Sequence, residues 1–552
     1  MKTILFSLLF MSCLAGATPL QDRWFYVART LAKPEHVQEV ADIVKTARSV
    51  DLNGMLFACG AEGIGGWDAA RRARLAAVKK VCDEAGIEII PIIWSVGYGG
   101  WNDAWCAADA CTNVPFVARG GRAVFEKGST PTIANGGFEE ASAKRVPGWK
   151  FIDQFGEISF VDTAVKASGA ASLRMENFTA NKHGHGRACA ALTVVPGRRY
   201  RVRAKMKTEG VAPLDGLRLQ VYAAKGGHIA ARSARMAATQ DWTELVCEFD
   251  SGARTDYYVY LGIWGGKAGR FWIDDVSVEE LGCPPPVVRE GLPFVVRDAK
   301  TGCVYREGVD YVVPVDVRKT KGQSFELVSG GAIADGTRLA VDYWTAVVVA
   351  DNQRPCCMSA PALYAHYRAS AAAIKEALNP RKWFLSMDEI RGGGTCPLCR
   401  ARNMDMAHQL ADCLARQREI IRAVRPDAEI YVWSDMLDPA HNAHDNYYAC
   451  RGTFAGVCDL IPKDIVMSCW YRKICRESVA YFTSNGFRVQ GAGYYDYDAE
   501  DTSRDLAWIG VLNATPKATG LMYTTWQGKY DLLEKFGQMM LEKGRAADST
   551  GK

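Results

Sequence analysis

Two adjacent carboxylates, Asp388 and Glu389, close a short apolar run that begins at Trp383. Arg391 and three glycines at 392–394 follow at once. An apolar run that ends in charged residues is typical of a strand in an α/β barrel, where catalytic groups sit at the strand ends. Paired carboxylates are the usual groups that cleave glycosidic bonds. The pair therefore indicates glycosidic hydrolysis if it lies in a catalytic site, and much less if it lies on an exposed loop.

The elements that would position this pair alternate between strand and helix on both sides of a long interruption. Before residue 100, the pattern predicts strands at 24–28, 53–59 and 87–94 and helices at 34–49 and 68–85. After residue 345, it predicts helices at 360–377 and 404–424 and strands at 383–388, 429–434, 465–470, 488–494 and 520–526. Three strands and five strands make eight, the number that a (β/α)₈ barrel needs.

The intervening residues carry a different pattern. Short alternating strands without convincing helices fill 124–282, which predicts a β-sandwich of jelly-roll type, and Cys283 with three prolines marks a boundary. We therefore predict an α/β fold, a (β/α)₈ TIM barrel interrupted after its third strand by this sandwich. The expected parts are a barrel section at 18–123, the sandwich at 124–282, a β-rich connection at 283–344 and a second barrel section at 345–552. Loops after barrel strands lie at the catalytic face, so the sandwich would overhang the site.

The N-terminal residues and the bulk composition indicate where the protein is located and which partners it binds. Residues 1–17 combine Lys2, an apolar run and the sequence Ala15-Gly16-Ala17, which predicts a cleaved signal peptide and an exported protein, whether periplasmic, cell-surface or secreted. No later stretch predicts a membrane span. The net charge is only +5 and forms no basic stripe, which argues against a nucleic-acid partner. The 15 Trp and 22 Tyr suit a glycan partner as well as core packing.

Polar and aromatic residues recur where the predicted barrel strands end. If the barrel is right, these ends converge on one pocket, and the side chains become candidates for substrate binding. The candidates are Arg29, Trp94, Trp433, Asp435, Trp470, Tyr494, Tyr495, Trp526 and Gln527.

The order and spacing of four segments, 380–389, 431–435, 467–470 and 524–527, resembles the family 20 glycoside hydrolases, the β-N-acetylhexosaminidases. The resemblance implies that Asp388 orients the 2-acetamido group of the substrate, whose carbonyl oxygen attacks the anomeric carbon, and that Glu389 is the general acid. It implies retention of configuration without a protein nucleophile, and no cofactor for catalysis.

The resemblance also assigns binding roles. It implies that Arg29 binds the sugar, that Trp433, Trp470 and Trp526 line the acetamido pocket, and that Tyr494 or Tyr495 hydrogen-bonds the acetamido carbonyl. We further expect a poorly hydrated pocket and the Asp388 charge to raise the pKa of Glu389.

Two departures from the family pattern keep other interpretations open. The family reads His-x-Gly-Gly before the acidic pair, where this chain has residues 384–387 as Phe-Leu-Ser-Met, and Gln527 stands where the family often has Glu. One alternative is a retaining glycosidase in which Glu389 is the acid and a carboxylate on the seventh strand, such as Asp496, is the nucleophile. Another is a glycan-binding protein without catalysis.

Within the insertion, the segments 134–139, 147–149 and 272–278 resemble the opening and closing strands of carbohydrate-binding modules. That resemblance implies a structural calcium ion, with Glu139 and Asp275 as candidate ligands. A purely structural sandwich without a ligand is the alternative, because such folds serve many roles.

Seventeen of the 18 cysteines follow the expected signal peptide. Export permits disulfides, and proximity in sequence suggests the pairs Cys106 with Cys111, Cys396 with Cys399, and Cys469 with Cys475. Cys396 and Cys399 form a CxxC, which fits a zinc half-site, a redox pair or a disulfide. Because no second CxxC or nearby CxxH accompanies it, we predict a disulfide that braces the loop after Glu389.

Overall fold

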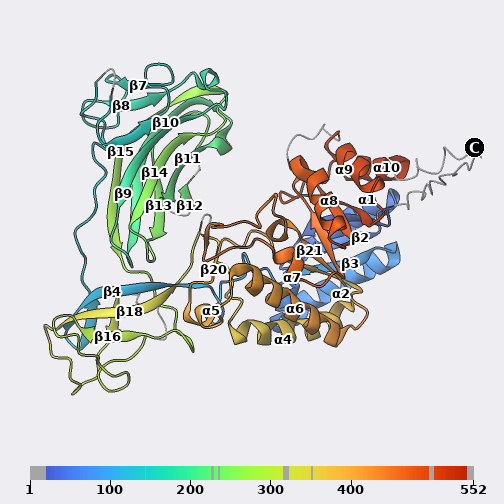
Figure 1. Cartoon of the computed structure of the whole chain (residues 1–552). Helices are drawn as coiled ribbons and strands as arrows, with labels where there is room; N and C mark the ends of the chain where they lie inside the picture. Colours follow the sequence, from blue (N-terminus) through green and yellow to red (C-terminus); the bar gives the residue numbers. More distant parts are fainter. Residues whose placement is uncertain are drawn as a thin grey trace, which may run out of the picture.

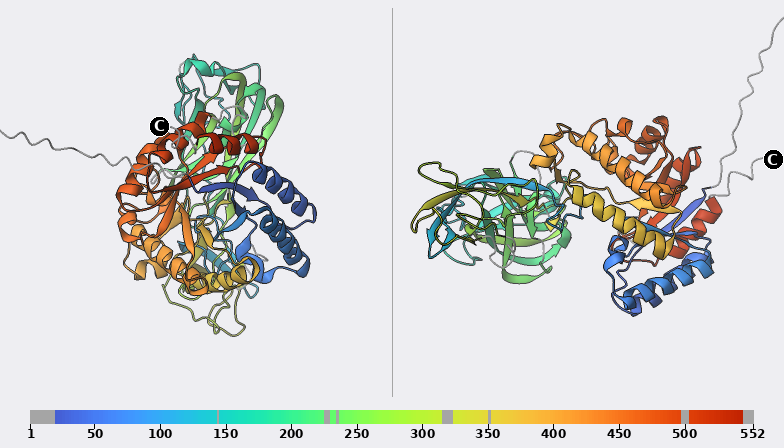
Figure 2. Two further views of the ribbon diagram at one scale, coloured as in Figure 1. Left: turned by 90° about the vertical axis from the view of Figure 1, so that its right-hand side faces the viewer. Right: turned by 90° about the horizontal axis from the view of Figure 1, so that it is seen from below.

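A computed structural model describes residues 20–142, 145–224, 229–233, 236–314, 323–349, 352–496 and 503–543. The expected signal peptide at 1–17 lies outside the described residues. Figures 1 and 2 show three bodies: a barrel, a sandwich of long strands, and a smaller sheet beside the lower end of the sandwich.

Eight parallel strands close into a barrel, which confirms the α/β barrel predicted from the sequence. Around the barrel they are β1 (Asp22–Ala28), β2 (Gly54–Ala58), β3 (Glu88–Ile93), β19 (Lys382–Leu385), β21 (Glu429–Trp433), β23 (Ile465–Cys469), β24 (Val489–Tyr494) and β25 (Ala518–Thr524). The strands are nearly all apolar because a parallel barrel buries both faces. β3 pairs with β19 although about 290 residues separate them in the chain.

Helices cover the outside of the barrel. They are α1 (Glu35–Ser49), α2 (Ala69–Ala85), α4 (Pro361–Leu378), α6 (Met406–Val424), α7 (Val457–Leu460), α8 (Cys475–Ser484), α9 (Ser503–Asn513) and α10 (Leu533–Lys543). The short helix α5 (Pro397–Ala401) lies instead on the side of the third sheet (Figure 1). Capping residues fix the ends of helices such as α2. Asp68 caps α2 by accepting the backbone N–H of Arg71 at 2.6 Å, and Gly86 ends it in the left-handed region.

Large side chains fill the barrel interior instead of leaving a pore. The Tyr431 ring stacks on Phe384 and lies tilted against Trp24, and Trp433 meets Phe384 edge-on at 4.6 Å between ring centroids. Phe384 is the position at which the resembled family carries His. Its ring is fully buried, so its role here is packing.

Two antiparallel sheets pack face to face around one apolar core to form the sandwich. The first has the order β13-β10-β15-β8-β7, the second β12-β11-β14-β9-β6. Their bounds are β6 (Trp149–Ile152), β7 (Ser159–Asp162), β8 (Ser172–Met175), β9 (Gly186–Thr193), β10 (Arg199–Ala212), β11 (Leu217–Ala223), β12 (Ile229–Ser233), β13 (Gln240–Asp250), β14 (Asp256–Ile263) and β15 (Ala268–Gly282).

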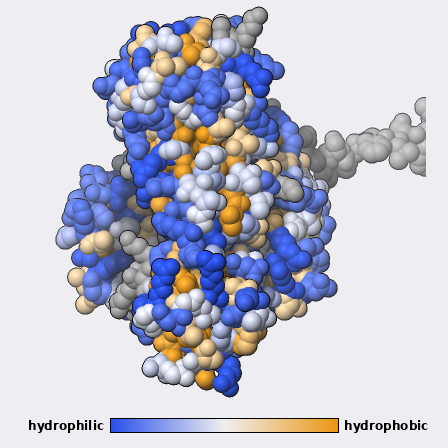
Figure 3. Space-filling view, turned by 90° about the vertical axis from the view of Figure 1, so that its left-hand side faces the viewer, coloured by the Kyte–Doolittle hydropathy of each residue, from blue (hydrophilic) through white to orange (hydrophobic). Residues whose placement is uncertain are grey.

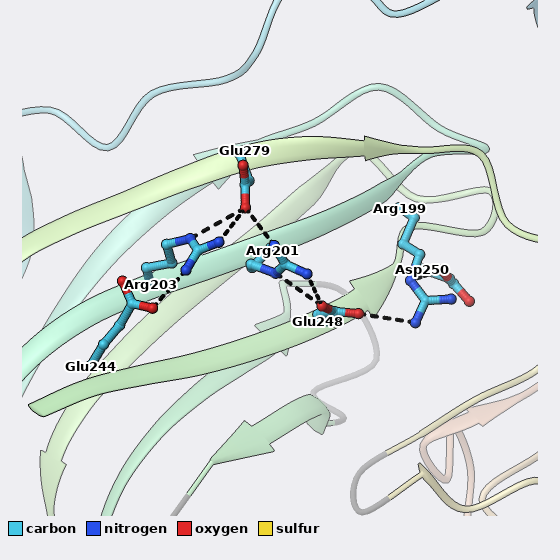
Figure 4. A network of polar contacts seen from close by, with 7 residues as sticks. All are labelled: Arg199, Arg201, Arg203, Glu244, Glu248, Asp250 and Glu279. Atoms are coloured by element: carbon cyan, nitrogen blue, oxygen red, sulfur yellow. Dashed lines mark hydrogen bonds and ion pairs between the residues drawn. The ribbon is translucent and has the colours of Figure 1, made fainter. Parts of the chain in front are cut away.

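The outer face of the first sheet is a ladder of alternating charges (Figure 4). Arg201 on β10 pairs with Glu248 on β13 at 2.5 Å and with Glu279 on β15 at 2.9 Å. Arg203 pairs with the same Glu279 at 2.9 Å and with Glu244 at 2.6 Å. Cross-strand ion pairs of this kind fix the pairing of neighbouring strands more than they stabilise the fold.

A third sheet joins residues from both sides of the sandwich. Its order is β16-β18-β4-β5-β17, with β4 (Ala108–Arg119), β5 (Arg122–Phe125), β16 (Val295–Asp298), β17 (Ser324–Glu326) and β18 (Arg338–Ala346). Residues 108–123, which we expected to belong to the barrel, therefore pair with the connecting segment, and the expected boundary at 123 falls inside β5. Hydrophilic residues cover most of the face that these two bodies turn away from the barrel, and apolar residues gather in a narrow band (Figure 3).

None of the three predicted disulfides is present, since Cys106, Cys111, Cys396, Cys399, Cys469 and Cys475 are all free thiols. The Sγ atoms of Cys396 and Cys399 lie 3.5 Å apart, and each lies 3.5 Å from the Sγ atom of Cys357. The prediction overlooked Cys357 because it lies 39 residues before Cys396. Over the described part of the chain, no helix is both long and apolar enough to cross a membrane.

Candidate active site

The acidic pair lies in the loop after β19, which ends at Leu385, three residues earlier than predicted. Glu389 adopts a left-handed backbone conformation with φ of 47°, which is costly for a residue with a side chain. The backbone is held on both sides: the N–H of Glu389 donates to Asp435 Oδ2 at 2.9 Å, and Gln353 Nε2 donates to its carbonyl at 2.8 Å. Strain that is fixed in this way is common at functional sites.

The side chain of Glu389 lies between a cation and a phenol. Arg391 Nη2 lies 2.6 Å from Oε1, and the hydroxyl of Tyr98 donates to Oε2. Gln353 Oε1 accepts a hydrogen bond from Arg391 at 2.7 Å, so the guanidinium is fixed as well. We expected burial and Asp388 to dominate the electrostatics of Glu389, but the sequence did not indicate that Arg391 would fold back onto it.

Asp388 and Asp435 lie side by side beneath the cavity. Burial, together with the Glu389 charge, raises the pKa of Asp388 to about 6, although Ser386 Oγ donates to its Oδ1 at 2.9 Å. Burial and the Asp388 charge raise the pKa of Asp435 to about 7. Asp435 still accepts hydrogen bonds from Asn442 at 2.8 Å and from Trp470 Nε1 at 3.3 Å. Two acids with coupled charges therefore titrate near neutral pH.

A cavity of about 910 Å³ opens above this pair at the carboxyl ends of the barrel strands. Such a volume accommodates a sugar-sized ligand. Its acidic lining residues are Glu62, Asp388 and Glu389, and its aromatic lining residues are Tyr26, Tyr98, Trp433, Trp470, Tyr471, Tyr494, Trp508 and Trp526.

Four of the predicted substrate-binding residues line this cavity, namely Trp433, Trp470, Tyr494 and Trp526. Trp526 is 53 % exposed and packs on Tyr26 with ring centroids 4.7 Å apart, so a broad apolar face remains open to the cavity. The structure thus brings together the three tryptophans that the sequence placed on three separate strands. Asp435 lies directly below them and supports the loop of Glu389 rather than lining the cavity.

Four other predicted residues lie elsewhere, and their placement corrects the sequence-based assignment. Arg29 turns away and pairs with Glu39 at 2.5 Å. Trp94 is buried outside the barrel, where its Nε1 donates to Ser370 at 2.7 Å and its ring stacks on Tyr367. Tyr495 stacks on Tyr523 in the outer core because it follows cavity-facing Tyr494 and alternation turns it outward. Gln527 is exposed, and its backbone N–H donates a hydrogen bond to the carboxylate of Asp496.

Among the cavity residues that the sequence reasoning did not propose, Tyr98 and Glu62 bear most directly on the acidic chemistry. Tyr98 lies in the loop after β3, and Glu62 lies in the short helix η1 (Ala61–Gly66) after β2. Burial raises the pKa of Glu62. The position of both just after barrel strands was a usable signal, but neither lies in the four segments that carry the family resemblance.

The candidate calcium ligands of the sandwich are both engaged with one loop. Glu139 Oε2 accepts the backbone N–H of Ala170 at 2.7 Å. Asp275 accepts the hydroxyl of Ser168 at 2.6 Å and forms an ion pair with Lys205 at 2.9 Å. In the described residues the donor cluster close enough to hold a metal ion is instead that of Cys357, Cys396 and Cys399.

Fold and site together define a parallel (β/α) barrel with an acidic, tryptophan-lined cavity at the carboxyl ends of its strands. No protein-family model matches the chain, and no curated protein is similar to it in sequence.

Among solved structures, a rhamnosidase from Novosphingobium sp. PP1Y aligns over 96 % of this chain and 59 % of its own, with 11 % identity and a TM-score of 0.35. A chitobiase from Flavobacterium johnsoniae aligns over 96 % of this chain and 51 % of its own, with 8 % identity and a TM-score of 0.35. The chain therefore spans little more than half the length of these two proteins. A structure titled "CBM4 structure and function" aligns over 27 % of this chain and 99 % of its own, with 17 % identity and a TM-score of 0.20.

Proposed function

We propose that the protein is a glycoside hydrolase that removes N-acetylhexosamine residues with the help of the substrate's own acetamido group. The observation that carries the proposal is the meeting of Asp388 and Glu389 with Trp433, Trp470 and Trp526 in one cavity. Flat indole faces pack on the apolar faces of a sugar ring, and carboxylates supply the charge and the proton that glycosidic cleavage needs.

The proposed roles follow from the surroundings of each carboxylate. Asp388 holds the N–H of the acetamido group, so that the acetamido carbonyl oxygen attacks the anomeric carbon and the Asp388 charge stabilises the cationic intermediate. Glu389 donates a proton to the departing oxygen and then takes one from the water that opens the intermediate. The Arg391 ion pair must loosen when the leaving group enters, because a carboxylate bound to a guanidinium holds no proton to donate.

A second candidate mechanism rests on Glu62. Burial raises the pKa of Glu62, as expected of a general acid, whereas Glu389 forms an ion pair with Arg391 and accepts a hydrogen bond from Tyr98. Two acids in such different environments suit a classical pair, with Glu62 as the acid and Glu389 as the nucleophile. This route does not need an acetamido group on the substrate.

Asp496 is a poorer candidate for the nucleophile. Its carboxylate accepts hydrogen bonds from the Thr525 hydroxyl and from the backbone N–H groups of Trp526 at 2.7 Å and Gln527 at 3.2 Å. These contacts tie β24 to the loop after β25 and use three of the roughly four acceptor sites of the carboxylate. Asp496 is also buried and does not line the cavity.

Paired aryl glycosides, with and without a 2-acetamido group, test the proposal. We expect hydrolysis of the acetamido substrate alone, inhibition by an N-acetylglucosamine thiazoline, and a loss of roughly 10²–10⁴-fold in kcat for Asp388→Asn and for Glu389→Gln. Glu62→Gln should retain activity, as should Glu39→Gln, a control that affects only an ion pair outside the cavity.

Other outcomes contradict the proposal in distinct ways. Equal turnover of both substrates, loss of activity in Glu62→Gln and a covalent adduct on Glu389 would establish the two-carboxylate route. Binding of glycans without turnover of either substrate would leave a glycan-binding protein.

A further inference from the structure

Three buried thiols from distant parts of the chain meet beside the candidate active site. Cys357 lies in the loop before α4, Cys396 caps α5, and Cys399 lies within α5. Their Sγ atoms form a triangle with sides of 3.5 Å. Three free thiols in mutual contact, each at most 3 % exposed, need a physical reason, because a small apolar residue would fill the same space.

The triangle has the dimensions of a metal site and not of a disulfide. A disulfide joins two sulfurs at about 2.05 Å and leaves the third out. Three thiolates on a tetrahedral zinc ion, with Zn–S bonds of about 2.3 Å, stand about 3.8 Å apart. An ion at that bond length from all three sulfurs would lie about 1.1 Å out of their plane, with its fourth coordination position directed away from them.

An unpartnered side-chain oxygen beside the three thiols indicates a fourth metal ligand. The three thiols line a small pocket together with Gln409 of α6, and this pocket has no room for a water molecule. Gln409 is 1 % exposed, and its Nε2 donates to the carbonyl of Met404 at 2.9 Å. Its Oε1 is buried without a hydrogen-bond partner in the described residues. A buried carbonyl oxygen that is left unsatisfied destabilises the fold, and coordination to a cation would remove that cost.

We propose that Cys357, Cys396 and Cys399 bind one zinc ion, with Gln409 Oε1 as the fourth ligand. Binding releases the thiol protons and leaves the sulfurs as thiolates. Because the pocket admits no water, the ion has four protein ligands and no open position, which makes the site structural and not catalytic.

The ion would fasten the loop that carries the acidic pair. Cys396 follows Arg391 by five residues, and β20 (Gly392–Gly393) between them pairs with β22 (Ala449–Cys450). On the other side, the N–H groups of Cys356 and Cys357 donate to the carbonyls of Val96 and Trp105, each at 2.7 Å, in the segment that carries Tyr98. One ion therefore connects the loops that supply Glu389, Arg391 and Tyr98.

Metal analysis of the purified full chain, expressed with added zinc and without chelator, tests the proposal. We expect about one zinc per chain in the wild type and near zero in Cys357→Ser and Cys396→Ser. Cys82→Ser, which changes an equally buried thiol on α2, should keep the ion. Wild-type protein without zinc, together with mass-spectrometric mapping of a disulfide among the three cysteines, would overturn the proposal without any variant having to fold.

The fourth ligand has its own test. With Co²⁺ as the probe, the wild type should show the intense thiolate-to-cobalt absorption and ligand-field bands of a four-coordinate site. Gln409→Ala should shift those bands and release the ion faster to a chelator, whereas Gln417→Ala, another buried glutamine on α6, should do neither. Unchanged bands and release in Gln409→Ala would refute the assignment of Gln409. These readouts do not require hydrolysis, so they stand or fall independently of the proposed activity.

Discussion

At the scale of single residues, the site is organised by charges that face one another at close range. Because the pKa values of Asp388 and Asp435 are raised to about 6 and about 7, the folded protein holds protons that the unfolded chain has already lost above pH 4. The free energy of unfolding contributed by these groups is therefore fully present below about pH 4 and decreases as the pH rises to about 7.

Removing the titrating group should remove part of that dependence. In Asp435→Asn, we expect the decrease in the free energy of unfolding between about pH 5 and about pH 8 to be smaller than in the wild type, as measured by urea denaturation at both values. Asp445→Asn is the matched control, since Asp445 is exposed and should leave the pH dependence unchanged. An identical decrease in Asp435→Asn and wild type would contradict a raised pKa.

Tyr98 contributes a single hydroxyl to the carboxylate of Glu389. Tyr98→Phe removes only that donor, so we expect kcat to change by roughly tenfold to a hundredfold while KM and the thermal midpoint stay close to wild type. Steady-state kinetics measures kcat and KM, and a thermal melt measures the midpoint. Tyr471→Phe is the control, because Tyr471 lines the same cavity but makes no contact with the acidic pair among the described hydrogen bonds. Equal kinetics in Tyr98→Phe and wild type would exclude a role for this hydroxyl.

At the scale of elements, the loop after β3 and the loop after β19 are pressed together. A Cβ atom on Gly97 would lie 2.3 Å from the carbonyl oxygen of Asp388, which is backbone and cannot move aside cheaply. Gly97→Ala should therefore displace the acidic pair and lower kcat strongly. Gly65→Ala, where a Cβ meets open space, should be near neutral. Kinetics and near-ultraviolet circular dichroism compare the two variants, and normal activity in Gly97→Ala would show that the loops separate easily.

Two tryptophans that follow barrel strands have different environments: Trp94 is buried in the core, and Trp526 lines the cavity. Trp94→Ala should cost about 3–5 kcal/mol of stability because the ring is buried between β3 and α4. Trp526→Ala should instead raise KM and leave the free energy of unfolding nearly unchanged, since its ring is half exposed in the cavity. Denaturation and kinetics on the same two variants separate these effects, and the reverse pattern would contradict the placement of the rings.

The elements were predictable because each has a strong local period, but the orientation of side chains at their ends was not. Apolar strands and capped helices gave the eight barrel strands within a few residues. Trp94 and Tyr495 were wrongly assigned to the cavity because the chain turns just after β3 and β24. At such a turn, a shift of one residue moves a side chain from the cavity side to the core side. The thiol cluster and the Arg391 ion pair depend on tertiary contacts, which a single sequence does not display.

At the scale of the whole molecule, the outer faces of the two sandwich sheets differ. One is the charged ladder of Figure 4, while the other carries half-exposed aromatic rings along β11 and β14: Tyr222, Tyr258, Tyr260 and Trp264. Burial and the charge of Tyr448 raise the pKa of Tyr222, so this face lies near the barrel loop whose Tyr448 packs under Arg391. We infer an aromatic path along this face of the sandwich, on the side of the Tyr448 loop.

This path should matter for long substrates only. In Tyr260→Ala, we expect activity on a polymeric glycan to fall several-fold while activity on a small aryl glycoside is unchanged, because the small substrate occupies the cavity alone. Glu244→Ala on the opposite sheet is the control and should affect neither substrate. A parallel loss on both substrates in Tyr260→Ala would mean that the sandwich acts through stability.

The pairing of β3 with β19 has a consequence for how the chain is made. The first three barrel strands leave the ribosome about 290 residues before their next neighbour, so two strand edges stay unpaired while all the strands of the sandwich, which lie within residues 149–282, are completed. The barrel can therefore close only after the strands of the sandwich, which lies beside it, have been made (Figure 1).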